Sequence, residues 1–444
     1  MRQILRGFGL GLVLVSPALP ATAQITTTLI CACEGNDPDA SIAACTTILK
    51  SPAADKATIY NAYVWRSWAD LSKKLYPQTI ADATQAIAIN PKNEQNYRRR
   101  GTAYDDMGAY APALADATTA ISLKPGDAKA YRLRAAAEVG LRSYDKAIAD
   151  ATRAIQLNPD DALNYGWRGR AYALSGNYDL ALADVSKATA LRPNNAGAYV
   201  LRDSIDLQTL HYDAAIADAT SAIKLDPQYA AAYEARGYAY AAEYHFTAAL
   251  PDLTEFVTLQ PADAHGYFRR GEVFHAMGNF QPAIADYTKG LSLQPNNAVA
   301  YVLRASAYKE AGQRSQGLSD LAKAESLAPT DPVSLGALCL GRAHFGDLAG
   351  ATADCDEAAR LNTGKSDLHR DILFGAFRGF LDLKRHEYNA ALKEYSTVLT
   401  INPKDATALY GRGLAEQAQG APGAQTDMAA AKNLDPEVAI QFAD

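Results

Sequence analysis

Two residue types return along this chain at a fixed interval of 34 residues, with no shift in either series. The tyrosines are Tyr63, Tyr97, Tyr131, Tyr165, Tyr199, Tyr233, Tyr267 and Tyr301, and the prolines are Pro91, Pro125, Pro159, Pro193, Pro227, Pro261, Pro295 and Pro329. Self-similarity at this period is typical of two packed helices per unit, stacked on their neighbours. The sequence therefore predicts an all-α solenoid.

One unit, Glu94 to Asp127, shows how each repeat is built. Apolar or small residues recur at helical spacing up to Tyr104, Gly108 interrupts the pattern, and a second helical face runs from Ala113 until Pro125 stops it. Ordering about 34 residues costs roughly 50 kcal/mol, which two short helices cannot offset by burying their own apolar surface. Neighbouring repeats must supply the remaining burial.

The unit resembles a tetratricopeptide repeat. The residues that carry the resemblance are Tyr97, Gly101, Tyr104, Ala113, Ala120 and Pro125. Their equivalents recur through roughly 380 of the 444 residues. The resemblance implies an α-solenoid, a right-handed superhelix of helical hairpins. It also implies a non-catalytic interaction scaffold whose concave groove binds peptides or proteins.

The first 23 residues have the pattern of a secretory signal peptide. Two arginines precede an apolar run that ends at Ala21-Thr22-Ala23. A short membrane anchor is the alternative, but the run is shorter than the roughly 20 residues that span a bilayer. The residues before Cys31 do not resemble a lipoprotein cleavage site. We expect a periplasmic or secreted protein with no integral membrane segment in the mature chain.

Charge narrows the classes of partner. Removing residues 1–23, with their two arginines, changes the formal net charge from −6 to −8. No basic excess remains to attract nucleic acid or anionic lipid. We expect a protein or peptide partner, or a glycan, and no nucleic acid.

Five cysteines in an exported chain predict disulfides. Residues 24–59 read as an N-terminal half-repeat cap without a proper first helix, held by a bond from Cys45 to Cys33 or, as the less favoured choice, to Cys31. Buried free thiols are the alternative. In the ninth repeat, Cys339 and Cys355 fall opposite each other in the hairpin, and we predict a disulfide between them. The tyrosine and an arginine of the other repeats are missing there.

Repeats fill residues 60–436, about eleven in all, and 437–444 form a closing segment. A six-residue insertion within 364–371 predicts a lengthened first helix, which Ser366 can cap.

A second ladder runs through the repeats, with arginine on each first helix and aspartate 16 residues later on the second. The arginines are Arg66, Arg100, Arg134, Arg168, Arg202, Arg236, Arg270 and Arg304, and the aspartates are Asp82, Asp116, Asp150, Asp184, Asp218, Asp252, Asp286 and Asp320. In an antiparallel hairpin the two positions fall at nearly the same height, which predicts a structural ion pair in each repeat. A stripe of ligand-binding arginines is the alternative.

The search for catalytic chemistry is negative. The seven histidines show no metal-ligand spacing, and no nucleophile motif, phosphate-binding loop or zincin sequence is present. We therefore predict no catalytic residues, no metal and no cofactor.

Positions on each first helix that point away from its partner helix should line the concave groove. The predicted ligand-binding residues are Arg98, Arg132, Arg170, Glu234, Tyr238, His265, Phe268 and Glu272. Tyr238 and Phe268 are the largest aromatic residues among them and are the predicted anchors for a partner segment. A solvated face without a ligand is the alternative.

These observations predict an exported, disulfide-stabilised interaction scaffold of the cell envelope. A carbohydrate- or polymer-binding module is the second hypothesis, and an enzyme is the third.

Overall fold

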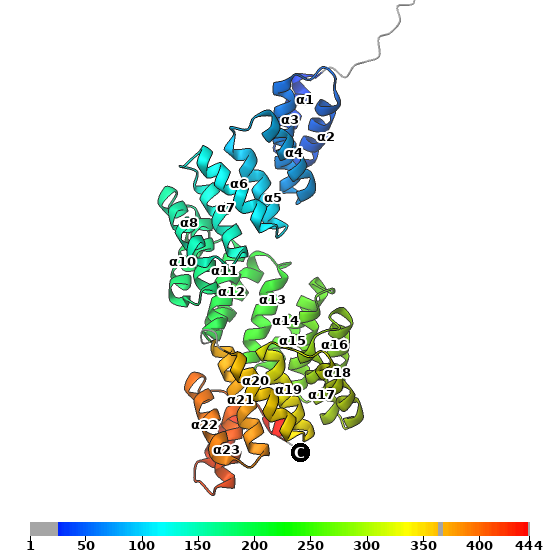
Figure 1. The fold of residues 1–444 in the computed structure, drawn as a ribbon, viewed down its shortest axis with the longest axis vertical. Helices are drawn as coiled ribbons and strands as arrows, with labels where there is room; N and C mark the ends of the chain where they lie inside the picture. Colours follow the sequence, from blue (N-terminus) through cyan, green and yellow to red (C-terminus); the bar gives the residue numbers. More distant parts are fainter. Residues whose placement is uncertain (1–24, 363–366, 443–444) are drawn as a thin grey trace, which may run out of the picture. The chain divides into compact units, whose positions relative to one another are not determined.

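The computed structural model describes residues 25–362 and 367–442, so the predicted signal peptide and Ser366 lie outside the described residues. The described chain is all-α, and it forms two compact units that divide after Ala171. Within each unit, helical hairpins stack on their neighbours in chain order (Figure 1). Each unit is a solenoid, as the repeat predicts.

The first unit contains α1 (Thr27–Cys33), α2 (Pro38–Lys50), α3 (Lys56–Ser72), α4 (Tyr76–Ile89), α5 (Glu94–Asp106), α6 (Tyr110–Leu123), α7 (Ala128–Gly140), α8 (Tyr144–Leu157) and most of α9 (Ala162–Leu174). The second unit continues with α10 (Tyr178–Leu191), α11 (Ala196–Gln208), α12 (Tyr212–Leu225), α13 (Ala230–Ala242), α14 (Phe246–Leu259), α15 (Ala264–Ala276), α16 (Phe280–Leu293), α17 (Ala298–Glu310), α18 (Arg314–Ser326), α19 (Pro332–Phe345), α20 (Leu348–Leu361), α21 (Leu368–Lys384), α22 (Tyr388–Ile401), α23 (Ala406–Ala418), α24 (Ala424–Leu434) and the 3₁₀ helix η1 (Val438–Phe442).

Local sequence sets the ends of these helices. Several first helices begin after an Asp or Asn cap; the side chain of Asp127, for example, accepts a hydrogen bond from Lys129 N at 3.0 Å. The turn inside each hairpin needs a left-handed residue, which glycine adopts at no steric cost at Gly108. Tyr244 occupies the same turn position with φ 62°. Such a conformation costs a non-glycine residue about 1 kcal/mol or more, so the surrounding structure must hold it.

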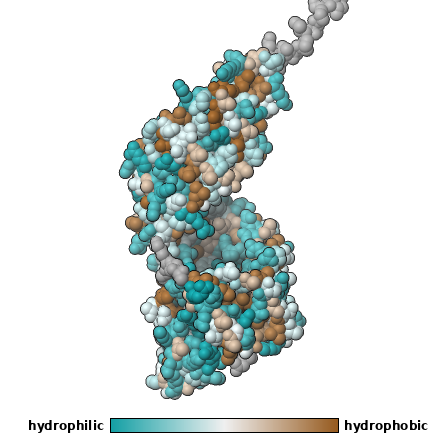
Figure 2. Space-filling view, viewed as in Figure 1, coloured by the Kyte–Doolittle hydropathy of each residue, from teal (hydrophilic) through white to brown (hydrophobic). Residues whose placement is uncertain are grey.

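The cores are built mainly from alanine. Ala113, Ala117 and Ala120 of α6 are all fully buried, which lets helices approach closely. Where a repeat has a larger residue, a glycine on the neighbouring helix makes room. A Cβ atom added to Gly266 would lie 2.5 Å from the ring of Phe256, so the ring needs that glycine. Hydrophilic residues dominate the surface in view, with hydrophobic patches scattered among them (Figure 2).

The Arg–Asp ladder is structural. In the repeat of α5 and α6, Arg100 donates two hydrogen bonds of 2.8 Å to Asp116, and its third nitrogen donates to Thr84 of the preceding repeat at 3.1 Å. The same two-point pairing joins Arg66 to Asp82, Arg134 to Asp150, Arg202 to Asp218, Arg236 to Asp252, Arg270 to Asp286 and Arg304 to Asp320. A planar guanidinium fits a carboxylate in this way. These arginines are occupied within the fold rather than presented to a ligand.

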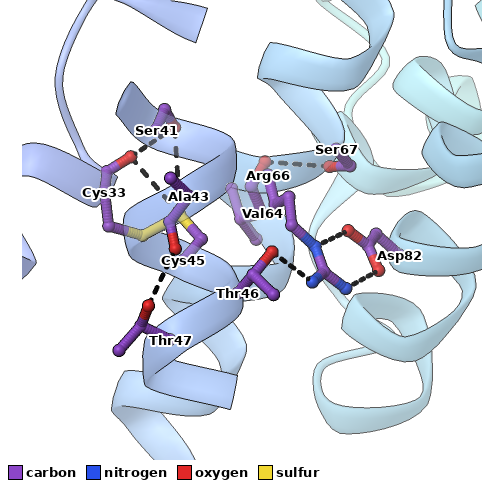
Figure 3. Close-up of a disulfide and its surroundings, with 10 residues drawn as sticks. All are labelled: Cys33, Ser41, Ala43, Cys45, Thr46, Thr47, Val64, Arg66, Ser67 and Asp82. Carbon is purple, nitrogen blue, oxygen red and sulfur yellow. Dashed lines mark hydrogen bonds and ion pairs between the residues drawn. A yellow bond between two sulfur atoms is a disulfide. The ribbon is translucent and has the colours of Figure 1, made fainter. Parts of the chain in front are cut away.

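The N-terminal cap is held by a disulfide between Cys33 and Cys45, the favoured pairing, and Cys31 is an exposed free thiol. Figure 3 shows this bond next to the Arg66–Asp82 pair. The sequence predicts a cap without a proper first helix, and the first helix of this cap is short. A seven-residue helix, α1, precedes α2, and Thr26 caps it by accepting from Leu29 N at 3.2 Å.

In the ninth repeat, Cys339 of α19 is joined to Cys355 of α20, as predicted. This repeat lacks the ladder arginine, but a different arginine forms an ion pair in its place. Arg342, one turn after the vacant position, places Nε 3.0 Å from Asp354 and 3.2 Å from Glu325 of the preceding repeat. The repeat therefore has both a covalent and an ionic link.

The insertion lengthens α21, which has 17 residues where most first helices have 13. Asp367 caps it by accepting from Arg370 N at 3.0 Å. This added length brings the start of α21 to the concave face of the second unit.

Candidate functional site

The concave face of the second unit contains a cleft of about 850 Å³, here called the groove cleft. Its walls come from the first helices α11, α13, α15, α17 and α19, and from the start of α21 opposite them. The cleft therefore lies where the repeats turn their first helices inward. It lies on the face that the sequence assigned to a ligand.

Helix α21 closes one side of the groove cleft by contacting repeats far earlier in the chain. His369 Nε2 lies 2.7 Å from the backbone carbonyl of Leu207, 162 residues away. Because a carbonyl only accepts, Nε2 carries the hydrogen, and Nδ1 accepts from the hydroxyl of Tyr238 at 3.3 Å. One histidine thus links α11, α13 and α21.

A second contact between distant repeats lies at the start of α23. The hydroxyl of Tyr244 accepts a hydrogen bond of 2.8 Å from the backbone N–H of Ala406, at the N-terminal end of that helix. This contact helps to hold Tyr244 in its left-handed conformation. Burial raises the pKa of its phenol, so the group is neutral.

The predicted anchor Tyr238 lines the groove cleft, but the protein itself already contacts it. Besides the bond to His369, the guanidinium of Arg269 lies 4.5 Å from the centre of its ring. Burial raises the pKa of the Tyr238 phenol. Arg269 was not predicted as a site residue, because the sequence shows only an arginine beside the ladder arginine Arg270.

Three further predicted residues lie near Arg269. His265 Nε2 lies 3.0 Å from Glu234 Oε1 and 3.3 Å from Arg269 Nε. Glu272 lies 3.3 Å from an Nη atom of Arg269. Glu234 and Glu272 line the groove cleft, and the half-exposed His265 lies beside Glu234. The structure therefore brings these residues together around one arginine.

The prediction for Phe268 was wrong. Its side chain is only 6% exposed and packs in the core of the α15–α16 hairpin, against Gly290. The position directly after the repeat tyrosine lies at the border between the groove and the next repeat. A long apolar side chain there turns into the core, where it loses contact with water. Val302, at the same position of α17, is buried too.

The predicted residues Arg98, Arg132 and Arg170 lie in the first unit. Arg98 Nε is 3.3 Å from Asp127, and Arg132 pairs with Asp161 and donates to Asn164 Oδ1 at 3.2 Å. Both arginines thus reach the start of the next first helix. Their side chains are only 25% and 17% exposed. Arg170 is exposed, and its guanidinium lies 5.6 Å from the centre of the Trp167 ring.

Asp203 is a groove-cleft residue that the sequence analysis missed. It is fully buried, and neither carboxylate oxygen has a hydrogen-bond partner among the described residues. Burial, together with the neighbouring Asp218, Asp206 and Glu234, raises its pKa to about 8. The sequence could have indicated that Asp203 is unusual. Asp203 stands at the helix-packing position that is Gly101, Gly169 and Gly237 in other repeats.

The groove cleft is acidic. Among its described lining residues, Asp203, Glu234, Glu272, Asp367 and Asp405 are acids, whereas Arg269 is the one permanent cation. No group of histidine, cysteine and acid side chains in the described residues is arranged to hold a metal ion. A search of the placed helices also finds no candidate for a transmembrane span. The arrangement can bind by charge, hydrogen bonds and apolar contact.

Family models match several parts of the chain. Two models described as "Tetratricopeptide repeat" match residues 264–297 and residues 98–162 and 134–196. A model described as "TPR repeat" matches residues 381–420. No curated protein sequence matches the chain.

Solved structures with a similar fold include three proteins. A tetratricopeptide repeat protein from Parabacteroides merdae is 22% identical, with 55% of this chain and 97% of that chain covered and a TM-score of 0.44. The Cut9–Hcn1 assembly of the APC/C is 14% identical, with coverage of 91% and 92% and a TM-score of 0.43. MamA is 25% identical, with coverage of 37% and 91% and a TM-score of 0.35.

Proposed function

Because this chain belongs to the tetratricopeptide repeat proteins, we propose that it is a non-catalytic protein-interaction scaffold, and that the groove cleft of its second unit binds a segment of a partner protein. The observation that carries the proposal is the groove cleft itself. Its volume of about 850 Å³ lies within the range of sites that enclose ligands, about 300 to 1,000 Å³. It has room for several side chains of an extended or helical segment.

The lining of the groove cleft favours a basic segment. Glu234 and Glu272 both line the groove cleft near Arg269, so a lysine or arginine of the partner would find two carboxylates there. Leu340 and Phe377 add apolar surface next to these charges. In such a site, apolar contact supplies most of the affinity, and the charges set orientation and association rate.

The glycan-binding alternative is less well supported. A sugar ring stacks on the open face of an aromatic side chain, and Arg269 lies over the ring of Tyr238. Binding of the protein to an immobilised glycan panel would distinguish the two hypotheses. We expect the protein to bind a protein segment and not the glycans of the panel.

We also propose that the protein acts outside the cytoplasm, in the periplasm or after secretion. Two disulfides support this location, because such bonds persist in oxidising compartments. The signal-peptide pattern of residues 1–23 supports it from the sequence.

The test is a pull-down from envelope extract, followed by calorimetry with the recovered partner and with synthetic segments of it. Glu234→Gln should weaken binding of a basic segment about five- to tenfold at low salt, and less at high salt because ions screen the charge. Glu255→Gln, on the second helix α14, is the matched control and should change nothing. Unchanged affinity in both Glu234→Gln and Tyr238→Ala, with normal helicity, would exclude the groove cleft as the site.

A further inference from the structure

A second cavity in the second unit lies beside the groove cleft and has a more apolar lining. It has a volume of about 330 Å³ and is called here the apolar cavity. Its wall comes from α15, α17, α19, α21 and the start of α23, and the 3₁₀ helix η1 completes it. It adjoins the groove cleft and shares some lining residues with it, among them Glu272 and Leu340.

The C-terminal segment forms one wall of this cavity. The ring of Phe442 lies 5.7 Å from Phe380 and 5.3 Å from Tyr410, measured between ring centres. The side chain of Gln441 accepts from Thr407 Oγ1 at 3.1 Å. Ile440 and Phe442 present their apolar side chains to the cavity. The segment therefore closes the cavity with aliphatic and aromatic surface.

Tyr287 is one of the lining residues of this cavity. It belongs to the second helix α16, at the position that is Ala117 in the α6 repeat. Its ring passes close to Gly271 of α15, where an added Cβ atom would lie 2.8 Å from the ring. The side chain is fully buried, and the hydroxyl has no hydrogen-bond partner among the described residues. Burial raises its pKa, so the phenol stays protonated and can donate.

His344 supplies the complementary group. Its Nε2 lies 2.9 Å from the carbonyl of Gln441, so Nε2 carries the hydrogen and Nδ1 is an acceptor. Burial lowers the pKa of His344 to about 4, so the ring is neutral at pH 7. Within the described residues, nothing hydrogen-bonds to Nδ1. Two residues that line the apolar cavity, Tyr287 and His344, therefore have one buried donor and one buried acceptor without partners in the described structure.

We propose that the apolar cavity binds a small neutral molecule with an apolar body and one hydroxyl or amide head group. A head group of this kind accepts from Tyr287 and donates to His344, which satisfies both buried polar atoms. An anionic head group is disfavoured because Glu272, Glu310 and Asp405 also line the cavity. A cavity of about 150 Å³ holds one benzene molecule, so this one has room for a body of about nine carbon atoms.

The experiment compares two probes with the same carbon chain, 1-nonanol and nonanoate, by calorimetry on the full-length protein. We expect 1-nonanol to bind and nonanoate to bind at least tenfold more weakly. Tyr287→Phe removes only the donor and should weaken 1-nonanol binding about tenfold. The fold should tolerate this change, because the hydroxyl makes no hydrogen bond within the described protein.

The chain offers a matched control in Tyr395. It occupies the same repeat position, is also fully buried against glycines and has a hydroxyl without a partner in the described chain, but it does not line this cavity. Tyr395→Phe should leave 1-nonanol binding unchanged. Absence of 1-nonanol binding, equal binding of nonanoate, or equal losses in the two tyrosine variants would each overturn the proposal.

The proposal stands or falls separately from the scaffold function. Glu234 lines the groove cleft and not the apolar cavity, so Glu234→Gln should leave 1-nonanol binding unchanged. The same variant is expected to weaken binding of the protein partner in the groove cleft.

Discussion

At the scale of single residues, the second unit keeps polar groups where its repeats otherwise place small ones. Asp203 occupies a helix-packing position of α11. Tyr287 belongs to the second helix α16, and its ring packs against Gly271 of α15. Both side chains are fully buried, and both have polar atoms without a partner in the described structure. Such groups destabilise a fold by about 1 to 3 kcal/mol each, so they mark positions that packing alone does not explain.

Asp203 should make the stability of the second unit depend on pH. Its folded pKa, about 8, lies above the unfolded value of 3.8, so the folded state holds a proton that the unfolded state loses. Stability should therefore fall as pH rises between these values, by up to about 1.4 kcal/mol per pH unit. Asp203→Asn should remove this slope and raise the melting temperature at pH 8.

Thermal unfolding of both proteins between pH 5 and 9 measures the effect. The exposed Asp213→Asn on α12 serves as the control and should behave like the unaltered protein. A slope that persists in Asp203→Asn would show that another group titrates.

At the scale of elements, an ion pair between arginine and aspartate holds most of the hairpins together, and in many of them it also reaches the preceding repeat. The arginine donates to the aspartate of its own second helix and, in many repeats, to a threonine of the preceding second helix. Such an arrangement links folding within a repeat to stacking between repeats. It explains why arginine and aspartate recur together at a constant separation.

A double-mutant cycle on Arg236 and Asp252 tests this role. Each alanine variant should destabilise by about 3 kcal/mol, because it leaves a partly buried charge unpaired. The double variant should lose less than the sum of the two by about 1 to 3 kcal/mol. The exposed pair Arg360–Glu357 is the control, and its coupling should be much smaller because solvent screens both charges. Additive losses at Arg236 and Asp252 would contradict the contact.

The Cys339–Cys355 disulfide also stabilises a hairpin, because it joins α19 to α20. Its 16-residue separation closes a loop whose loss should cost about 3 kcal/mol in the chain-entropy model. Replacing both cysteines by alanine should lower the melting temperature, with the Arg342–Asp354 pair holding the hairpin together. Cys31→Ser should have no effect, because that thiol is exposed and free. Peptide mapping without reductant should find Cys31 alone alkylated.

At the scale of the whole molecule, the chain forms two compact units, and the groove cleft belongs to the second one. In the second unit, the accumulated turn of successive repeats brings α21 back to α11 and α13 and brings α23 back to Tyr244. Contacts between residues 162 positions apart thus define the groove cleft.

Export is the prediction that belongs to the whole chain. Mass spectrometry of the protein from its natural host should find Gln24 as the first residue, because the pattern that ends at Ala23 favours cleavage there. A cytoplasmic protein that begins at Met1 would contradict the export proposal and its oxidising compartment.

The sequence by itself determined the repeat, the hairpin, the Arg–Asp ladder and the pairing of Cys339 with Cys355, and it left Cys45 with two candidate partners, Cys33 and Cys31. These features recur at fixed spacing or lie within one hairpin, where helix geometry places residues 12 or 16 positions apart side by side. Sequence also identified Tyr238, Glu234 and Glu272 as groove residues. It could not show that Phe268 turns into the core or that His369 closes the groove cleft. Those outcomes depend on how neighbouring side chains share space and on small rotations added over several repeats, and only the tertiary structure decides them.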